Sequence, residues 1–337
     1  MYNSRLNEKF GFEKIDIANN KAIMKSLWRL MTTKATVVYF TIAQTKGGNW
    51  RDLLFLNVIA LRKKKCIVHL HGGYYRTLID SDCSAFQRKL NIYAMKRVDA
   101  AIVLGDSLHW IYEGLVPDEK IFTVKNCIDD QFCAADIDEK LVEVKKVKKL
   151  HVLYLSNFIA SKGYPELLEV ASLLHERGLD DKFEFHFAGK FFEQKEEDFF
   201  RGYVKENALE RIVTLHGPTY GEAKSELLRK CQVFSLLTTY PNEGQPISIL
   251  EAMGNGMAIV TTDHAGIADI ATAENGFVCK KTEIDTTAVA DYLERMYADR
   301  ESLAEVCKKN FVRVRNEFTE RNYIDAMERV FDAVVNN

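Results

Sequence analysis

The sequence predicts an α/β protein with two parallel sheets, each forming a Rossmann-like domain. Short apolar runs alternate with stretches of helical periodicity along nearly the whole chain, which is typical of parallel strands joined by helices. The alternation comes in two series, separated by a charged stretch at residues 128–149. A length of 337 residues also suits two domains. Ligands of such folds bind at the carboxyl edges of the strands.

The first series predicts an N-terminal domain over residues 1–127. Helical periodicity at 51–61 and 83–98 fills the longer gaps between its strands. The strands are expected at residues 13–17, 35–42, 66–71, 100–104 and 121–124.

After a linker at 128–149, a second domain is expected over residues 150–317, and a final amphipathic helix at 318–335 could pack back on the first domain. Its strands are expected at residues 151–155, 184–188, 212–216, 233–237, 258–262 and 276–278. Its helices are expected at residues 164–178, 192–206, 221–230 and 247–253.

Composition is that of a globular protein, with 47% hydrophobic and 28% charged residues. Seven scattered cysteines without a CxxC pair favour reduced thiols in the cytoplasm and argue against a zinc site. The longest apolar run is far shorter than the ~20 residues of a membrane span.

Charge is unevenly distributed. The first 100 residues contain 18 Lys and Arg against 7 Asp and Glu, whereas the whole chain has a net charge of −2. No nucleic-acid motif accompanies this excess, so we expect no nucleic-acid partner. Lys21, Lys25, Arg29 and Lys34 lie on an apolar helical stretch, and a basic run occupies 62–65. This pattern suits peripheral binding to an anionic membrane surface, and a solvated face of a soluble domain is an equal alternative.

The stretch from Tyr240 to Met253 carries the strongest functional signal. It follows a buried strand and enters a helix expected to end near Gly254, with Pro246 at the first helical position. The main-chain N–H groups around Gln245, Ile247 and Ser248 would then form an anion site. Glu243 and Glu251 flank it. Two glutamates eight apart also occur by chance, but the apolar neighbours of Glu251 place it on a core-facing side of the helix.

Three further strand ends could carry chemistry. Lys162 follows a strand and precedes a helix, where a cation is favourable beside an anion; a solvent-facing lysine is the alternative. His69 and His71 project to the same side of a strand, but no third metal ligand is evident. We expect His71 to face a cleft beside Gly72 and Gly73, and His69 to lie in the core. The segment 45–48 is expected to be a flexible loop.

Several of these motifs occur together in a known family. Asn126-Cys127-Ile128-Asp129, Ser161-Lys162-Gly163, His216-Gly217-Pro218, the Glu-x7-Glu pair and Asn275-Gly276-Phe277-Val278 appear in the order seen in family 4 glycosyltransferases, which the chain therefore resembles. The resemblance implies a retaining, B-type enzyme, with two Rossmann-like domains facing each other across a cleft. It also implies that no metal is needed.

The resemblance also implies a role for each matching residue. Glu251 would accept hydrogen bonds from ribose hydroxyls, and Glu243 would lie near the donor sugar. Main-chain N–H groups from Gly244 to Ile247 would hold sugar or phosphate oxygens. Lys162 would neutralise the leaving diphosphate, and His71 would contact the sugar from the opposite domain.

Two departures from the family pattern are visible. Asn157 occupies the place of an arginine five residues before the lysine, and the first domain is expected to lack the family's usual first strand and glycine-rich loop. The sequence thus predicts a hexosyltransferase that moves a sugar from a nucleotide-sugar donor to a glycan or lipid-linked acceptor in cell-surface polysaccharide synthesis. The alternatives are a non-catalytic sugar-nucleotide-binding or partner-dependent subunit on the same fold and, less favoured, a sugar-nucleotide epimerase.

Overall fold

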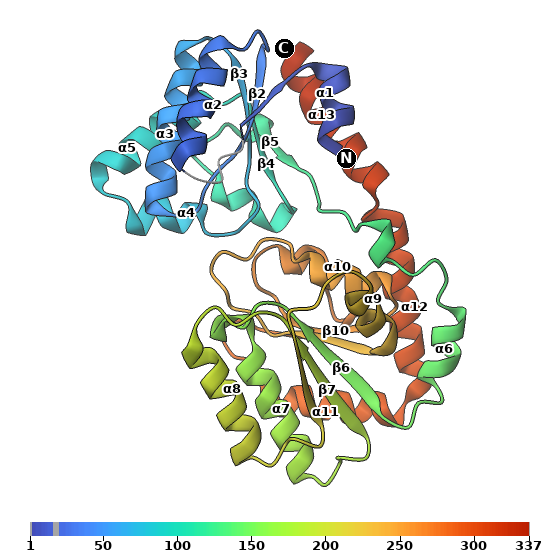
Figure 1. The fold of residues 1–337 in the computed structure, drawn as a ribbon. Helices are drawn as coiled ribbons and strands as arrows, with labels where there is room; N and C mark the ends of the chain where they lie inside the picture. Colours follow the sequence, from blue (N-terminus) through green and yellow to red (C-terminus); the bar gives the residue numbers. More distant parts are fainter. Residues whose placement is uncertain (1, 16–19, 337) are drawn as a thin grey trace. The chain divides into compact units, whose positions relative to one another are not determined.

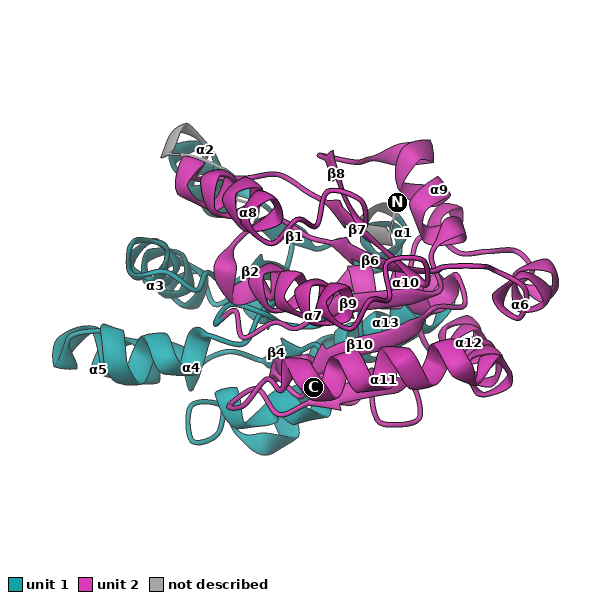
Figure 2. Ribbon diagram, turned by 90° about the horizontal axis from the view of Figure 1, so that it is seen from below, with its two compact units in different colours: residues 1–126, 241–245, 321–337 teal, residues 127–240, 246–320 magenta. Residues whose placement is uncertain are grey.

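The computed structural model describes residues 2–15 and 20–336, apart from the side chains of residues 2–4 and 20–22. The chain divides into two compact units (Figure 2). Unit 1 comprises Met1–Asn126, Pro241–Gln245 and Arg321–Asn337, and unit 2 comprises Cys127–Tyr240 and Pro246–Glu320. A five-residue segment that follows a strand of unit 2 therefore packs as part of unit 1.

Unit 1 contains a five-stranded parallel sheet in the order β1-β2-β3-β4-β5. Each predicted strand of the first domain is present, although residues 16 and 17 of the first one lie outside the described residues. The strands are β1 (Glu13–Ile15), β2 (Val37–Thr41), β3 (Lys65–His69), β4 (Ala100–Val103) and β5 (Ile121–Thr123).

Helices cover both faces of this sheet (Figure 1). One face carries α2 (Asn20–Thr32), α3 (Lys46–Leu61) and α5 (Ala85–Met95). The other carries α1 (Tyr2–Phe10) and the last helix, α13 (Glu320–Asn336), whose Phe331 lies 4.7 Å from the ring of Phe12 in a shared core. Shorter helical segments are α4 (Tyr75–Thr77), η1 (Leu78–Asp82), η2 (Asp106–Ile111) and η3 (Asp118–Lys120).

The segment 45–48 is not the flexible loop that the sequence suggested. Helix α3 begins at Lys46, and the hydroxyl of Thr45 accepts a hydrogen bond from the N–H of Gly48 as its N-cap. The two glycines hid the start of the helix, because glycine disfavours helix interiors but is tolerated where a side-chain cap satisfies the first turn.

Unit 2 contains a six-stranded parallel sheet in the order β11-β10-β9-β6-β7-β8. The order reverses between β9 and β6, so the loops after these strands diverge and leave room for a ligand. The strands are β6 (Leu150–Leu155), β7 (Phe183–Ala188), β8 (Val213–Gly217), β9 (Val233–Leu236), β10 (Ala258–Thr262) and β11 (Gly276–Cys279), which match the six predicted ones.

The four helices predicted for the second domain are present as α7 to α10, with their ends shifted by at most two residues, whereas α11 and α12 were not predicted. The segment expected to be a linker contains a helix, α6, whose Val144 is buried in the core of this unit. The longer helices are α6 (Asp138–Val144), α7 (Tyr164–Glu176), α8 (Gln194–Glu206), α9 (Gly221–Lys230), α10 (Ile247–Gly254), α11 (Thr286–Ala298) and α12 (Arg300–Glu317). The short ones are η4 (Asp130–Phe132), η5 (Ala160–Lys162) and η6 (Ala265–Asp269).

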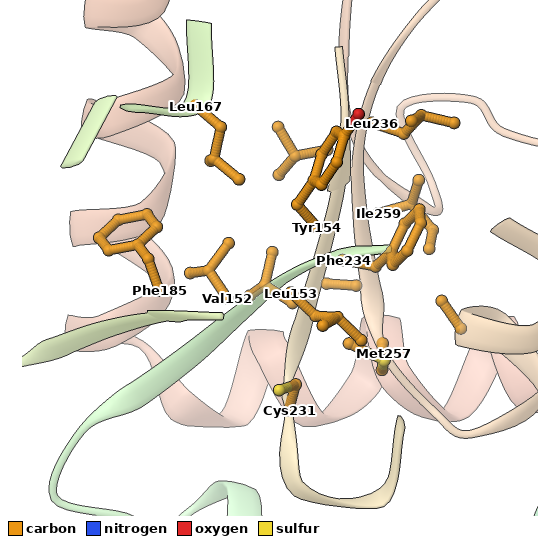
Figure 3. Packing of buried hydrophobic residues seen from close by; sticks show 14 of the residues in the cluster. Val152, Leu153, Tyr154, Leu167, Phe185, Cys231, Phe234, Leu236, Met257 and Ile259 are labelled. Atoms are coloured by element: carbon orange, nitrogen blue, oxygen red, sulfur yellow. The ribbon is translucent and has the colours of Figure 1, made fainter. Parts of the chain in front are cut away.

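The core of unit 2 explains why its strands are apolar on both sides. Val152 and Phe185 point toward Leu167 of α7, whereas Leu153 points toward Met257 on the other face (Figure 3). Leu153 is the register partner of His186, so His186 shares that second face. Burial of both faces is characteristic of parallel sheets covered by crossover helices.

No helix within residues 2–15 and 20–336 combines the length and apolar character that crossing a membrane requires.

Candidate functional site

A pocket of about 440 Å³ lies at the carboxyl edge of the sheet in unit 2. Its walls come from the segments that follow β6, β7 and β8 and from the first turns of α9 and α10. The lining residues are Leu155, Ser156, Asn157, Ala188, Gly189, Lys190, Pro218, Thr219, Tyr220, Lys224, Ile247, Ser248 and Glu251. The pocket is thus located beside the reversal of strand order, where open α/β sheets bind ligands.

Glycines let the loops of this edge pack closely. A Cβ at Gly189, whose φ is +156°, would lie 1.8 Å from the carbonyl oxygen of Ser156. Gly163 has a φ of +85°, and a Cβ there would lie 2.3 Å from the carbonyl oxygen of Leu237. The turn after β6 therefore packs closely against the ends of β7 and β9, and only glycine fits at positions 163 and 189.

Glu251 is buried in the second turn of α10 and forms an ion pair with Lys224 of α9, with 2.6 Å between Oε1 and Nζ. Burial raises the pKa of Glu251, while the hydrogen bond and charge of Lys224 oppose that rise. The ammonium of Lys224 also lies 4.0 Å from the ring centre of Phe132. This pair places a carboxylate acceptor and a cation side by side in the pocket wall.

Helix α10 starts at Ile247. Pro246 is therefore the N-cap of this helix, whereas the sequence suggested that it would be the first helical residue. No side chain caps this end. The first-turn N–H groups of Ile247 and Ser248 therefore remain for water or a ligand, and both residues line the pocket.

Asn157 and Lys190 line the pocket, but Lys162 is not among the described residues that do. The ammonium of Lys162 lies 4.7 Å from the ring centre of Tyr240, at the end of unit 2 from which the chain enters the Pro241–Gln245 segment.

The Pro241–Gln245 segment packs on unit 1. Its Gln245 side chain donates to the carbonyl of Leu104 (3.0 Å) and accepts from the N–H of Asn126 (2.7 Å). A Cβ at Gly244 would lie 2.6 Å from the carbonyl oxygen of His71. Glu243 is buried within this segment. The structure thus brings together His71, Glu243, Gly244 and Gln245 in one unit.

The sequence suggested that glycine at position 72 allows a ligand to approach the main chain, but the structure gives another reason for glycine there. A Cβ there would lie 2.5 Å from the carbonyl oxygen of Asn242 and 2.1 Å from the side-chain amide of Gln44. The main chain at Gly72 therefore has the close neighbour that glycine permits, but this neighbour is the protein itself.

His69 is a buried core residue, as predicted, and its Nδ1 lies 2.6 Å from the hydroxyl of Tyr39. Burial holds the pKa of His69 well below its usual value, so the ring is neutral. His71 stacks on it with 4.1 Å between ring centres, and its own side chain is exposed.

Sequence reasoning did not single out Lys190 and Lys224. Lys190 could have been found, because Gly189-Lys190 ends a strand in the same way that Lys162 follows one. Lys224 gave no comparable signal, since its role depends on the packing of α9 against α10, which brings it to Glu251.

Comparisons with known proteins identify the family of the second half of the chain. The sequence model described as glycosyl transferases group 1 matches residues 136–312, which is more than half of the chain. A curated relative, the putative colanic acid biosynthesis glycosyltransferase WcaL of Escherichia coli K12, is 25% identical over 178 residues. This match covers 51% of the chain but only 42% of the length of WcaL.

Solved structures share the fold along nearly the whole chain. Anabaena Alr3699/HepE, solved in complex with UDP, superposes with a TM-score of 0.73 at 14% identity, covering 94% of this chain and 82% of that one. A glycosyltransferase from Rickettsia africae also gives a TM-score of 0.73 at 14% identity, covering 96% and 84%. At such identities the likeness is one of fold.

Proposed function

The chain belongs to the glycosyl transferases group 1 family, and from this premise we propose that it is a retaining glycosyltransferase. It transfers a sugar from a nucleotide-sugar donor to a glycan or lipid-linked acceptor in the synthesis of a cell-surface polysaccharide. The relative WcaL, whose name refers to colanic acid biosynthesis, supports the polysaccharide assignment. A uridine nucleotide is the first donor to consider, since the related fold of HepE was solved with UDP.

One observation carries the proposal. The pocket in unit 2 combines a buried carboxylate, Glu251, with the N-terminal residues Ile247 and Ser248 of α10 and two lysines, Lys190 and Lys224. Carboxylates accept hydrogen bonds from vicinal hydroxyls, while helix N-termini and ammonium groups hold phosphates. A ribose linked to a diphosphate carries both kinds of group.

The chemistry follows from where charge develops. As the glycosidic bond breaks, positive charge grows on the sugar ring and negative charge on the diphosphate. Lysines and N–H groups that point at the diphosphate stabilise this state more than the ground state. In a front-face transfer the departing phosphate oxygen accepts the acceptor's proton, so the reaction uses no separate strong base. We assign Lys162 to the diphosphate, and Glu243 and His71 to the sugar.

No metal takes part in the proposed transfer. The lysines supply the positive charge that a divalent ion provides in other nucleotide-sugar enzymes. Sugar transfer should therefore persist in the presence of a chelator.

The decisive measurement is release of nucleoside diphosphate from a panel of sugar nucleotides, with glycan and lipid-linked acceptors present or absent. Acceptor-dependent release with retained anomeric configuration supports the proposal. Calorimetric donor binding without turnover, whatever the acceptor, would instead favour a partner-dependent binding subunit. Asn157, which offers a dipole where the family has a cation, motivates this second possibility. Conversion of the donor sugar into an epimer, without any acceptor present, would indicate an epimerase.

We further propose that unit 1 binds an anionic membrane surface from the cytoplasmic side. Met24, Trp28 and Met31 form an exposed stripe along α2, and 68–72% of Met24 and Trp28 is accessible. Exposed Lys25 and Arg29 flank the stripe. An apolar stripe beside basic residues on one helix is typical of interfacial helices.

Only part of the basic cluster expected at 62–65, which follows α3, faces solvent. Arg62 and Lys63 are exposed, whereas Lys64 donates to the carbonyl of Thr33 and Lys65 to that of Val334. Lys21 lies outside the residues whose side chains are described. Arg29 forms an ion pair with Glu13, with 2.5 Å between Nη2 and Oε1. Of the predicted cations, Lys25, Lys34, Arg62 and Lys63 are exposed and therefore available to lipid headgroups.

Vesicle sedimentation tests the membrane proposal. The triple variant Met24→Ser, Trp28→Ser, Met31→Ser should bind anionic vesicles at least about tenfold more weakly, because each buried apolar side chain contributes on the order of 1 kcal/mol or more. The change Phe192→Ser, at a 61% exposed aromatic residue of unit 2, is the matched control. Equal binding to neutral and anionic vesicles would exclude the electrostatic part.

A further inference from the structure

A cluster of histidines on the sheet of unit 2 is not used by the proposed transfer. His151 lies on β6, Glu184 and His186 on β7, and His216 on β8, three strands that are neighbours in the sheet. Glu184 and His186 are two apart and so project to the same face. His151 is the register partner of Glu184. Residues up to 65 positions apart in the sequence thus meet on one face.

His151, Glu184 and His186 each offer a ligand atom, and these atoms lie within 4.8 Å of one another. Nδ1 of His151 lies 3.0 Å from Nε2 of His186. Oε2 of Glu184 lies 3.9 Å from Nδ1 of His151, and Oε1 of Glu184 lies 3.5 Å from Nε2 of His186. In a tetrahedral site with bonds of about 2.0–2.2 Å, ligand atoms are about 3.3–3.6 Å apart. The observed separations bracket this value, so small side-chain rotations would create the site.

We propose that His151, Glu184 and His186 bind a divalent transition metal ion of the zinc type, with water in the remaining position. Two imidazoles and a carboxylate form a ligand set that zinc accepts readily. The assignment is independent of the proposed transfer, since none of the three residues lines the pocket that contains Glu251.

A second layer of contacts supports the assignment. Nδ1 of His186 lies 3.0 Å from Nε2 of His216. When Nδ1 of His186 carries the proton and donates it to His216, Nε2 keeps a lone pair that faces His151 and Glu184. Orientation of a ligating histidine through its other ring nitrogen is typical of metal sites.

Lys230 is a competitor of a metal ion for the Glu184 carboxylate. With His216 it lines a pocket of about 510 Å³, which shares Pro218, Thr219 and Tyr220 with the pocket that contains Glu251. Nζ of Lys230 lies 3.7 Å from Glu184, so its charge opposes a metal ion. About half of the Lys230 side chain is accessible, and this flexible residue ends helix α9, so it can turn toward solvent when an ion binds.

The test is titration of the full chain with Zn²⁺ by calorimetry and with Co²⁺ by visible absorption. We expect one ion per chain, a spectrum of nitrogen and oxygen ligands without sulfur-to-cobalt charge transfer, and a rise in melting temperature. His216→Ala should weaken binding 10–100-fold, and His186→Ala should weaken it further. Lys230→Gln should strengthen it. His175 lies on α7 and pairs with Asp180, and His175→Ala should leave metal binding unchanged.

Circular dichroism establishes that each variant is folded, and Glu184→Gln, which preserves shape, provides a second ligand variant if His186→Ala does not fold. Absence of one-to-one binding by the folded wild type would overturn the proposal. Binding that survives both ligand variants, or that shows a cysteine spectrum, would overturn it as well, because the ion would then be held elsewhere.

Discussion

The carboxyl edge of the sheet in unit 2 and the helices α2 and α3 of unit 1 present opposite kinds of surface. In unit 2, Glu251 is 4% exposed and is paired with Lys224, so its charge acts at short range in a confined pocket. On unit 1, Trp28 is 68% exposed and lies beside cations that face solvent. A buried, paired charge can select one small molecule, whereas exposed apolar and basic side chains suit a broad surface.

A comparison within α9 makes the same point on a smaller scale. Lys224 pairs with buried Glu251, while Arg229 of the same helix pairs with Glu222, whose side chain is 74% exposed. Exposed pairs typically contribute 0–1 kcal/mol, whereas breaking a buried pair costs about 3–5 kcal/mol. The two pairs have the same types of charge. Because only the Lys224–Glu251 pair is buried, we expect that breaking it lowers stability, whereas breaking the Arg229–Glu222 pair changes stability little.

The largest expected effect comes from Glu251→Ala, because breaking its buried pair with Lys224 costs about 3–5 kcal/mol of stability in addition to the lost donor contacts. Loss of hydrogen bonds between a carboxylate and ribose hydroxyls, at about 1.5–3 kcal/mol for a charged partner, should weaken donor binding about 10–100-fold. Calorimetry with the donor measures this. Glu222→Ala is the matched control and should bind like the wild type. Similar affinity in the two variants would remove the distinction between the buried and the exposed pair.

Next in size is Gly163→Ala in the turn that carries Lys162. The left-handed conformation costs a non-glycine residue about 1–2 kcal/mol, and the clash with the carbonyl of Leu237 adds about 1–3 kcal/mol. Gly178→Ala is the control, because its φ of +71° is similar but nothing lies within 4 Å of the added Cβ. Denaturant unfolding should show the larger loss at Gly163; equal losses would mean that the turn adjusts without cost.

A pH effect is expected in unit 1. The folded-state pKa of His69 is depressed, so the unfolded chain takes up a proton first as pH falls below about 6.5. The stability that the neutral ring contributes is therefore present above that pH and is lost as pH falls toward the folded-state pKa. Melting curves of wild type and His69→Gln should converge between pH 7 and pH 5. Parallel curves would show that His69 does not titrate in this way.

The smallest predicted change is Thr45→Ala at the N-cap of α3. Loss of the bond from Gly48 should cost about 1 kcal/mol of stability. Donor affinity should not change, because Thr45 belongs to unit 1 and the pocket to unit 2. Thr45→Ser keeps the hydroxyl and should behave like the wild type in both assays. A fall in donor affinity would show that the two regions are coupled.

Much of the fold could be predicted because local patterns determine it. The inner strands are largely buried on both faces, so they appear in the sequence as apolar runs, such as Val152 to Tyr154. The edge strand β8 differs, because Thr214 and His216 are exposed. The amphipathic pattern at 318–335 likewise predicted α13. The start of α3 was missed, because its cap depends on one hydroxyl rather than on periodicity.

The site divides along the same line. The sequence alone determined the strand ends and the two glutamates, since chain order and alternation of strand and helix place Asn157 and Glu251 at the carboxyl edge of one sheet. Only the tertiary structure decided that Lys224 pairs with Glu251, that Glu243 packs with unit 1, and that His151, Glu184 and His186 converge. Those partners are far apart in the chain, and side-chain contacts between separate elements depend on packing and register, which no local pattern encodes.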